Sequence, residues 1–327
     1  MRAAWYTNQG PAREVLEIGE IEAPIPKPGE VRVRIHTSGV NPVDVKRRTG
    51  GRGQMEPTVV IPHFDGGGVI EKTGEGVDAG RIDERVWVYE AQWNSDFGTA
   101  AEYVTVPATR AIPLPACTSF EDAACLGIPA LTAHRCVYGD GPVDGKTILV
   151  TGGGGAVGNY AVQFARLGGA HVLSTVSGDE KMALAKLAGA HEVINYREED
   201  IAERVMGVTD GKGTDRIVEV ELGGNLSDSL AILKPNGVIS AYASEALPDP
   251  LIPFYSMLYK NLTLRFELVF LMPEEAKKSA VSDISNWLVD SLLHHHIADV
   301  YPLQDVAAAH EAVERGPLGK VLLNLSG

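Results

Sequence analysis

The chain has 327 residues, of which 44% are hydrophobic and 22% charged, as is ordinary for a soluble globular protein of about two domains. Its net charge of −14 opposes general nucleic-acid binding, because the phosphate backbone is also negative. No apolar run approaches the ~20 residues of a membrane span, and we expect neither a signal peptide nor membrane insertion. Cys117, Cys125 and Cys136 form no C-x-x-C pair and no evident disulfide framework, which predicts a reducing, cytoplasmic location.

The first third of the chain has the patterns of β structure. Residues 31–37 alternate between apolar and polar side chains, as a half-buried strand does. A strand with a glycine turn is expected at 67–77, and further strands are expected at 84–89 and 99–106. Prolines are frequent in residues 24–62 and 107–115, which favours a compact β-barrel with loops.

From about residue 123 the pattern changes to an alternation of helices and strands. Helices are expected at 121–138, 157–168, 179–188, 198–206 and 226–233, and strands at 147–151, 171–176, 192–194, 216–221 and 237–242. This alternation predicts a parallel sheet covered on both faces. A late strand at 262–270, a long helix at 274–293 and a final strand follow. The predicted layout is a catalytic domain of residues 1–123 and 271–327 around a nucleotide domain of residues 124–270.

A glycine cluster in the expected nucleotide domain is the most informative local feature. Gly153, Gly155 and Gly158 fit G-x-G-x-x-G after a predicted strand and before a predicted helix. Glycines let the backbone turn tightly against a pyrophosphate, and the free N–H groups of the helix start hold its charge. The motif predicts a dinucleotide site, with a glycine-rich turn that binds nothing as the alternative. The candidate contacts are Gly153, Gly154, Gly155, Ala156 and Val157.

Taken together, these segments resemble the zinc-free quinone oxidoreductases, the zeta-crystallin-like branch of the medium-chain dehydrogenase/reductase superfamily. The resemblance runs from the first strand to the last residues. Its motifs are GVNPVD (39–44), GIPALTAHR (127–135), TGGGGAVG (151–158), GAHEVINYRE (189–198), and YPL with the later AHE and GK (301–320). The resemblance implies an α/β protein with a GroES-like β-barrel catalytic domain plus a Rossmann domain with a doubly wound parallel sheet. It also implies NADPH as reductant, a quinone as substrate, and a homodimer or homotetramer.

Zinc alcohol dehydrogenases of the same superfamily hold a catalytic metal with a Cys, a His and a Cys. The matching positions here are Asn41, Phe64 and Ile128, and the last two side chains have no donor atom. The superfamily's structural zinc site uses four closely spaced cysteines, and none occurs between residues 90 and 111. The three consecutive histidines at 294–296 point in different directions near a helix end and are expected to be solvated. We therefore expect no metal, which argues against alcohol oxidation, because that reaction would lack its Lewis acid.

The residues after the second nucleotide-domain strand bear on the choice of cofactor. NAD-specific folds place an acid there to bind the ribose hydroxyls, but this strand ends without one. Ser177 and Lys181 suit a 2′-phosphate instead, because lysine is a compact positive charge. The resemblance places Tyr196 near the adenine or the phosphate. We therefore favour NADPH, although a later strand end would let Asp179 or Glu180 select NADH.

Three residues are candidates for catalysis. The amide of Asn41 could donate to a substrate oxygen or to the nicotinamide ribose, while the run from Asn41 to Asp44 also predicts a helix start, and both roles are compatible. Lys46 stands where the family has a tyrosine. It could act as a donor if burial favoured its neutral form, or it could belong to a solvated basic run with Arg47 and Arg48. Thr132 matches the family position that approaches the nicotinamide, with an ordinary helix threonine as the alternative.

Aromatic residues supply the last candidates. Tyr242 and Phe270 are candidate cofactor contacts. The strand at 262–270 is expected to pair with its twin in a second subunit, because an exposed apolar edge would otherwise invite aggregation.

The function predicted first is NADPH-dependent reduction of quinones, by hydride or single-electron transfer, without zinc. The alternative is reduction of the C=C bond of an enone or alkenal, because the same pocket serves both and its loops vary. A second alternative, from another class, is an NADPH-binding structural or RNA-binding protein without catalysis.

Overall fold

The computed structural model describes residues 1–51, 53–55 and 58–326, which form two compact units. Unit 1 contains Met1–Ile128 and Val281–Gly327, and unit 2 contains Pro129–Ala280. The domain boundaries expected after residues 123 and 270 lie near these divisions. They remain predictions. In the described part of the chain, no helix is long and apolar enough to cross a membrane.

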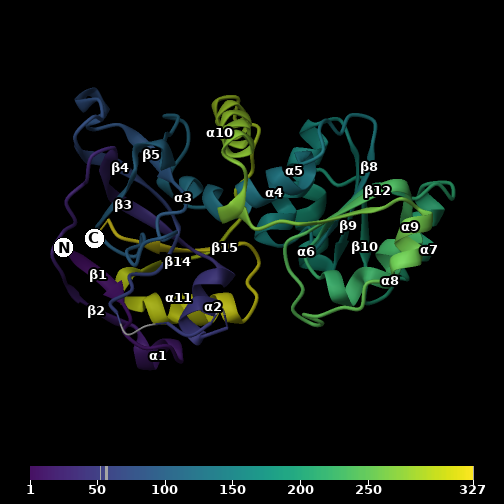
Figure 1. Cartoon of the computed structure of the whole chain (residues 1–327), viewed down its shortest axis with the longest axis horizontal. Coiled ribbons are helices and arrows are strands. Elements are labelled where there is room, and N and C mark those ends of the chain that lie inside the picture. The colour runs from purple at the N-terminus through teal and green to yellow at the C-terminus, as the bar shows by residue number, and fades with distance from the viewer. Residues whose placement is uncertain (52, 56–57, 327) are drawn as a thin grey trace. The chain divides into compact units, whose positions relative to one another are not determined.

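Unit 2 is built on a six-stranded parallel sheet with the order β10-β9-β8-β11-β12-β13 (Figure 1). The strands are β8 (Thr147–Thr151), β9 (His171–Val176), β10 (Glu192–Asn195), β11 (Thr214–Glu219), β12 (Leu233–Ala241) and β13 (Thr263–Phe266). The helices are α4 (Leu131–Tyr138), α5 (Ala156–Leu167), α6 (Asp179–Leu187), α7 (Ile201–Val208), α8 (Leu222–Ile232) and α9 (Phe254–Tyr259). Because the chain winds outward on both sides of β8, the sheet is doubly wound, as predicted.

The core of unit 2 follows from its strand pattern. Buried side chains of β8, β9, β10 and β11 pack against Val205 of α7 and Leu222 and Leu226 of α8. Helices α4, α5 and α6 contact one another in sequence, and α5 lies against β8 and β9. Strands buried on both faces are near-continuous apolar runs, which is why these segments were recognisable from sequence.

Unit 1 is built on a seven-stranded sheet with the order β14-β15-β3-β4-β5-β7. The long strand β3 (Glu30–Val40) pairs along one edge with β4 (Asp65–Thr73). Its other edge is shared: β6 (Tyr103–Pro107) pairs with the first half of β3, and β15 (Lys320–Asn324) with the second half. Strands β5 (Arg85–Val88), β7 (Ala111–Pro113) and β14 (Ile297–Pro302) complete this sheet, while β1 (Arg2–Trp5) and β2 (Glu17–Glu20) form a separate antiparallel pair.

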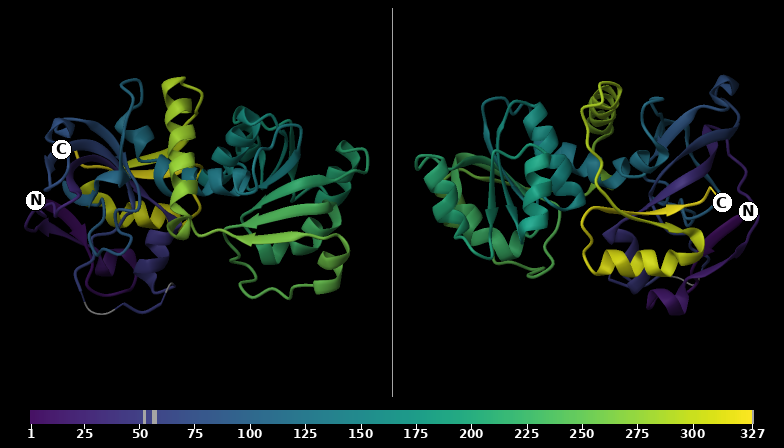
Figure 2. Two further views of the ribbon diagram at one scale, coloured as in Figure 1. Left: turned by 45° about the horizontal axis from the view of Figure 1, so that its top comes forward. Right: turned by 180° about the vertical axis from the view of Figure 1, so that it is seen from behind.

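Short helices complete unit 1. They are α1 (Ala12–Val15), α2 (Pro42–Thr49), α3 (Phe120–Ala123) and α11 (Val306–Glu314), while α10 (Glu274–Val289) crosses the division between the units. Single 3-10 turns of unit 1 lie at Ala79–Arg81, Ala108–Arg110 and Leu303–Asp305, and one at Val269–Leu271 belongs to unit 2. Figure 2 shows α11 and β15, in yellow, beside segments from the first third of the chain, and both termini lie in this unit.

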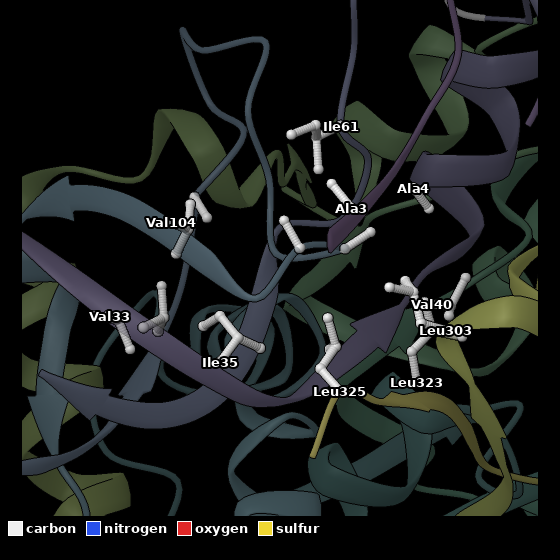
Figure 3. Packing of buried hydrophobic residues seen from close by; sticks show 14 of the residues in the cluster. Ala3, Ala4, Val33, Ile35, Val40, Ile61, Val104, Leu303, Leu323 and Leu325 are labelled. Carbon is white, nitrogen blue, oxygen red and sulfur yellow. The ribbon is translucent and has the colours of Figure 1, made fainter. Parts of the chain in front are cut away.

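The core of unit 1 joins the two ends of the chain. Ala3 and Ala4 of β1, Val33 and Ile35 of β3, and Leu323 of β15 belong to one buried cluster (Figure 3). The C-terminal segment is therefore part of the core and of the sheet.

Two sequence-based expectations were wrong in detail. The helix expected at 121–138 is broken into α3, a π-helical turn at Leu126–Ala130 and α4, because Pro129 has no N–H to donate to the helix ladder. The strand expected at 262–270 ends at Phe266, since the chain then turns into the 3-10 turn Val269–Leu271.

Candidate functional site

The glycine-rich loop of unit 2 has the close packing that the motif predicted. The loop leaves β8 through Gly152, whose φ of 70° is left-handed, and Gly155 precedes α5. A Cβ on Gly153 would lie 2.0 Å from Ser174 Oγ, and a Cβ on Gly158 would lie 2.2 Å from the carbonyl oxygen of Gly152. Side chains at these positions would push the loop off β9 and α5, so the backbone N–H groups stay open to a ligand only with glycine.

Lys181 lies directly against this loop. A Cβ on Gly154 would meet Lys181 Cβ at 2.6 Å and Lys181 Cγ at 2.8 Å. Because the parallel strands end at one edge of the sheet, Ser177 after β9 and Tyr196 after β10 follow at the same edge. Tyr196 is 49% exposed, so its ring is available for stacking. The structure thus brings the predicted loop, Ser177, Lys181 and Tyr196 to one edge of unit 2.

The other predicted residues of unit 2 lie on separate elements. Tyr242 follows β12, where its N–H donates to the carbonyl of Glu219 at 3.1 Å, and burial raises the pKa of its phenol well above the usual value. Phe270 is buried in the turn after β13, and Thr132 is buried in the first turn of α4. Their contacts with a cofactor stay predictions.

A buried carboxylate that the sequence analysis missed shapes the same edge. Glu219, the last residue of β11, accepts hydrogen bonds from Thr151 Oγ1 at 2.8 Å, from the Glu221 N–H at 2.7 Å and from Asn225 Nδ2 at 2.9 Å. Burial raises its pKa, although these bonds favour the charged form. Glu219 ties the start of the glycine loop to α8. The available signal was an acid at the end of an otherwise apolar strand.

In unit 1, Asn41 begins α2 as the sequence predicted. The Asn41 N–H donates to Asp44 Oδ2 at 2.6 Å, and Pro42 occupies the first helical position. Burial is the main cause that raises the pKa of Asp44 to about 7.

The amide of Asn41 belongs to a buried polar cluster. Asn41 Nδ2 donates to Asp65 Oδ2 at 2.8 Å, and Lys320 Nζ donates to Asn41 Oδ1. Lys320 Nζ also lies 3.1 Å from Asp65 Oδ2, while the Ile128 N–H donates to Asp65 Oδ1 at 3.0 Å. A Cβ on Gly39 would lie 2.8 Å from Lys320 Cε, so only glycine leaves room for the lysine. The cluster occupies both ends of the Asn41 amide, and donation from Asn41 to a substrate stays a prediction.

This cluster does not fit a zinc ion. Of the three positions that match zinc ligands of the superfamily, Asn41 and Ile128 bond within the cluster and Phe64 precedes Asp65. Phe64 and Ile128 offer no side-chain donor, and the Lys320 ammonium contacts both Asn41 and Asp65. Over the described ranges, no group of three or more His, Cys, Asp or Glu side chains is arranged for a metal ion. No step of the chemistry is therefore assigned to zinc.

Lys46 lies on α2 and is half-buried. The alternative interpretation, a solvated basic run, is wrong for Arg48, which is fully buried, while Arg47 is half-buried with NH2 3.5 Å from Asp96 Oδ1. Helix α2 is too short for its hydrophobic periodicity to indicate which of the three basic residues faces the core.

Comparison with known proteins matches both halves of the chain to dehydrogenase families. The model described as "Alcohol dehydrogenase GroES-like domain" matches residues 27–116, and the model described as "Zinc-binding dehydrogenase" matches residues 156–286. Human quinone oxidoreductase is 31% identical over 95% of this chain and 94% of its own length. A Burkholderia 2-haloacrylate reductase is 30% identical over 99% of this chain and 98% of its own length.

Solved structures show the same similarity. A structure titled NAD-dependent alcohol dehydrogenase superposes with a TM-score of 0.90 at 29% identity, covering all of both chains. Escherichia coli quinone oxidoreductase in complex with NADPH superposes with a TM-score of 0.86 at 25% identity, covering 99% of this chain and 100% of that one. By this full-length similarity, the chain belongs to the zinc-free quinone oxidoreductase family of the medium-chain dehydrogenase/reductase superfamily.

Proposed function

We propose that the chain reduces quinones with NADPH in a reaction that needs no zinc. The observation that carries the proposal is the glycine loop of unit 2, with the Lys181 side chain packed against Gly154. The loop amides suit a pyrophosphate, and Lys181 with Ser177 suits a 2′-phosphate. The NADPH-bound Escherichia coli relative supports the same cofactor.

When bound, NADPH supplies the hydride, and the protein supplies position and a proton or hydrogen-bond source. Glu219 holds the glycine loop to α8, and Thr132 is the candidate contact at the nicotinamide. A quinone that takes up a hydride needs one further proton to become a hydroquinone. Lys46 is our candidate for the residue that donates a hydrogen bond to the quinone oxygen, since both ends of the Asn41 amide are engaged in the buried cluster.

A second candidate reaction is reduction of an activated C=C bond. It is favoured by the similarity to the 2-haloacrylate reductase, which extends over nearly the whole of both chains. Both reactions use the same hydride source, so the difference lies in the acceptor.

We further propose a homodimer or homotetramer in the cytoplasm. Strand β13 is an edge of the unit 2 sheet, and it carries Phe266 with 71% of its surface exposed. Leu268 and Leu271 beyond the strand and Phe254 and Tyr259 on α9 are exposed as well. An apolar edge strand of this kind suits pairing with a second copy. The cytoplasmic location rests on the three free cysteines.

The experiment that tests the proposed function follows the absorbance of NADPH with 1,4-benzoquinone or 9,10-phenanthrenequinone as acceptor. NADH, an enone and a chelator form parallel arms. We expect NADPH-dependent turnover on quinones that the chelator leaves unchanged. Turnover on the enone alone would assign the second reaction, and preference for NADH would overturn the cofactor assignment. Binding of NADPH without turnover on either acceptor would support the non-catalytic alternative.

A further inference from the structure

A buried row of hydrogen bonds in unit 1 is not used by the proposed chemistry. Arg48 Nε of α2 donates to His310 Nδ1 of α11 at 3.3 Å, and His310 Nε2 lies 3.0 Å from His63 Nε2. His63 Nδ1 lies 2.9 Å from Ser38 Oγ of β3. These four side chains are fully buried, so the bonds form away from water.

The row continues to the polar cluster around Asn41. Ser38 Oγ lies 2.7 Å from Thr99 Oγ1, and Thr99 Oγ1 donates to the carbonyl oxygen of Asp65 at 2.6 Å. The carboxylate of the same Asp65 bonds Asn41, Lys320 and the Ile128 N–H. The row therefore connects two helices to the backbone of the residue at the centre of the cluster.

The two ends of the row fix the direction of every bond. A guanidinium only donates, so His310 Nδ1 is bare and the proton of the neutral ring is on Nε2. His310 Nε2–H donates to His63 Nε2, which leaves the His63 proton on Nδ1 to donate to Ser38. A carbonyl oxygen only accepts, so the Thr99 hydroxyl donates to Asp65 and the Ser38 hydroxyl donates to Thr99. The two histidines must therefore be opposite tautomers.

The row has no place for an additional proton. A second proton on His63 would face the His310 N–H, and a second proton on His310 would face the Arg48 N–H. Burial first, and then the charge of Arg48, lowers the pKa of His310 to about 3. Burial, His310 and Lys320 hold the pKa of His63 well below its usual value. Two carboxylates face the Arg48 end: Glu314 accepts a hydrogen bond from Arg48, and Glu311 interacts with the charge of Arg48.

The backbone of His63 shows that its position is strongly constrained. Its φ of 80° lies in the left-handed region, which is uncommon for residues other than glycine, although asparagine, aspartate and histidine adopt it more often than the rest. A fully buried residue persists in this conformation only when its surroundings over-determine it. The side-chain bonds to Ser38 and His310 contribute to that constraint, together with the Thr99 N–H, which donates to the His63 carbonyl at 3.0 Å.

We propose that His63 and His310 are positioning residues, each held neutral in one tautomer, and that their one-way chain from Arg48 fixes Asp65 and so the cluster of Asn41 and Lys320. The inference goes beyond the proposed function, because it applies to whichever acceptor the chain reduces.

The first test is the tautomer of each ring. The full chain, labelled with ¹⁵N only at its nine histidines, is studied by long-range ¹H–¹⁵N correlation between pH 7.5 and 5.0. We expect His310 with its proton on Nε2, His63 with its proton on Nδ1, and neither ring gaining a proton over this range. His310→Gln or His63→Gln assigns the pair, because either variant removes one of the two signals, and exposed His171 serves as the internal reference. The same tautomer on both rings, or a charged ring at pH 6, would overturn the proposal.

The second test separates positioning from mere stability. Thr99→Val removes the hydroxyl that donates to Asp65, while Thr99→Ser keeps it. We expect kcat to fall about 10- to 100-fold in the valine variant, with the NADPH Kd unchanged, and to recover in the serine variant. An unchanged kcat in Thr99→Val, or an equal loss in both variants, would contradict the positioning role. The kinetic test depends on the proposed reaction, whereas the NMR test does not. Failure of the proposed function can therefore be distinguished from failure of this inference.

Discussion

Acid should destabilise unit 1 through the two buried histidines, and His310→Gln measures how much. The folded pKa of His310 is lowered to about 3 by burial, whereas an unfolded histidine titrates near 6.5. Below pH 6.5 the His310 ring is therefore protonated in the unfolded state but stays neutral in the folded state. Stability from the neutral ring is fully present above pH 6.5 and is lost as the pH falls toward 3.

The magnitude follows from these two pKa values. At pH 5.0 the pH is about 1.5 units below the unfolded pKa, so protonation stabilises the unfolded state. At about 1.36 kcal/mol per unit, the free energy of unfolding falls by about 2 kcal/mol. Any folded pKa below about 4 gives the same result at pH 5.0, so the prediction does not depend on the value within about a unit. Glutamine offers an acceptor and a donor but does not titrate in this range, and it should remove about 2 kcal/mol of acid destabilisation between pH 7.5 and 5.0.

The assay is urea unfolding at a series of pH values for the wild type, His310→Gln and a control, His171→Gln, at an exposed histidine. The quantity compared is the difference from the wild type, because Asp44 acts in the opposite direction. Because its folded pKa is raised to about 7, the charged carboxylate lowers the free energy of unfolding at high pH, and its protonation on acidification restores that stability. If the wild type and His310→Gln lose stability in parallel between pH 7.5 and 5.0, the buried neutral ring is not responsible and the reasoning fails.

Three further predictions concern the cofactor, the cluster and the edge strand. Lys181→Ala should weaken NADPH binding about 10- to 150-fold, as loss of a charge-assisted bond of about 1.5–3 kcal/mol implies, and leave NADH binding unchanged. Lys186→Ala on the same helix is the control. Equal effects on the binding of both cofactors in a titration would show that Lys181 does not contact the 2′-phosphate. Lys320→Met should lower the free energy of unfolding by about 3–5 kcal/mol, because it leaves the carboxylate of Asp65 buried without its cation; a loss no larger than that of exposed Lys72→Met would show that the pair contributes little. Phe266→Glu should reduce self-association in sedimentation velocity, whereas an unchanged mass would exclude β13 as the subunit edge.

Sequence patterns predicted unit 2 better than unit 1, for a physical reason. Strands β8 and β9 match the expected ranges because buried parallel strands are continuous apolar runs bounded by glycine and polar turns. The sequence pattern does not predict strand β14 and helix α11 individually. It predicts one helix over α3 to α4, because the break depends on backbone geometry around Pro129.

The candidate site was predictable where its residues are close in sequence. The glycine loop and the start of α2 are local motifs whose geometry is set by neighbouring residues. The pairs Asp65–Lys320 and His63–His310 join residues 255 and 247 positions apart, and no local pattern relates them. Such contacts exist only after β15 has paired with β3 and α11 has packed beside α2.

The place of Lys320 on β15 also affects the order in which the protein can mature on the ribosome. Residues 129–280, which form unit 2, have left the peptidyl-transferase centre before the lysine is added. Until then, Asp65 and Asn41 have no cation beside them, and β3 lacks one of its partners. The buried cluster of the first third can therefore form only after residue 320 has been added. A chain that stopped between residues 280 and 320 would contain all of unit 2 but would lack the cation that pairs with Asp65 in unit 1.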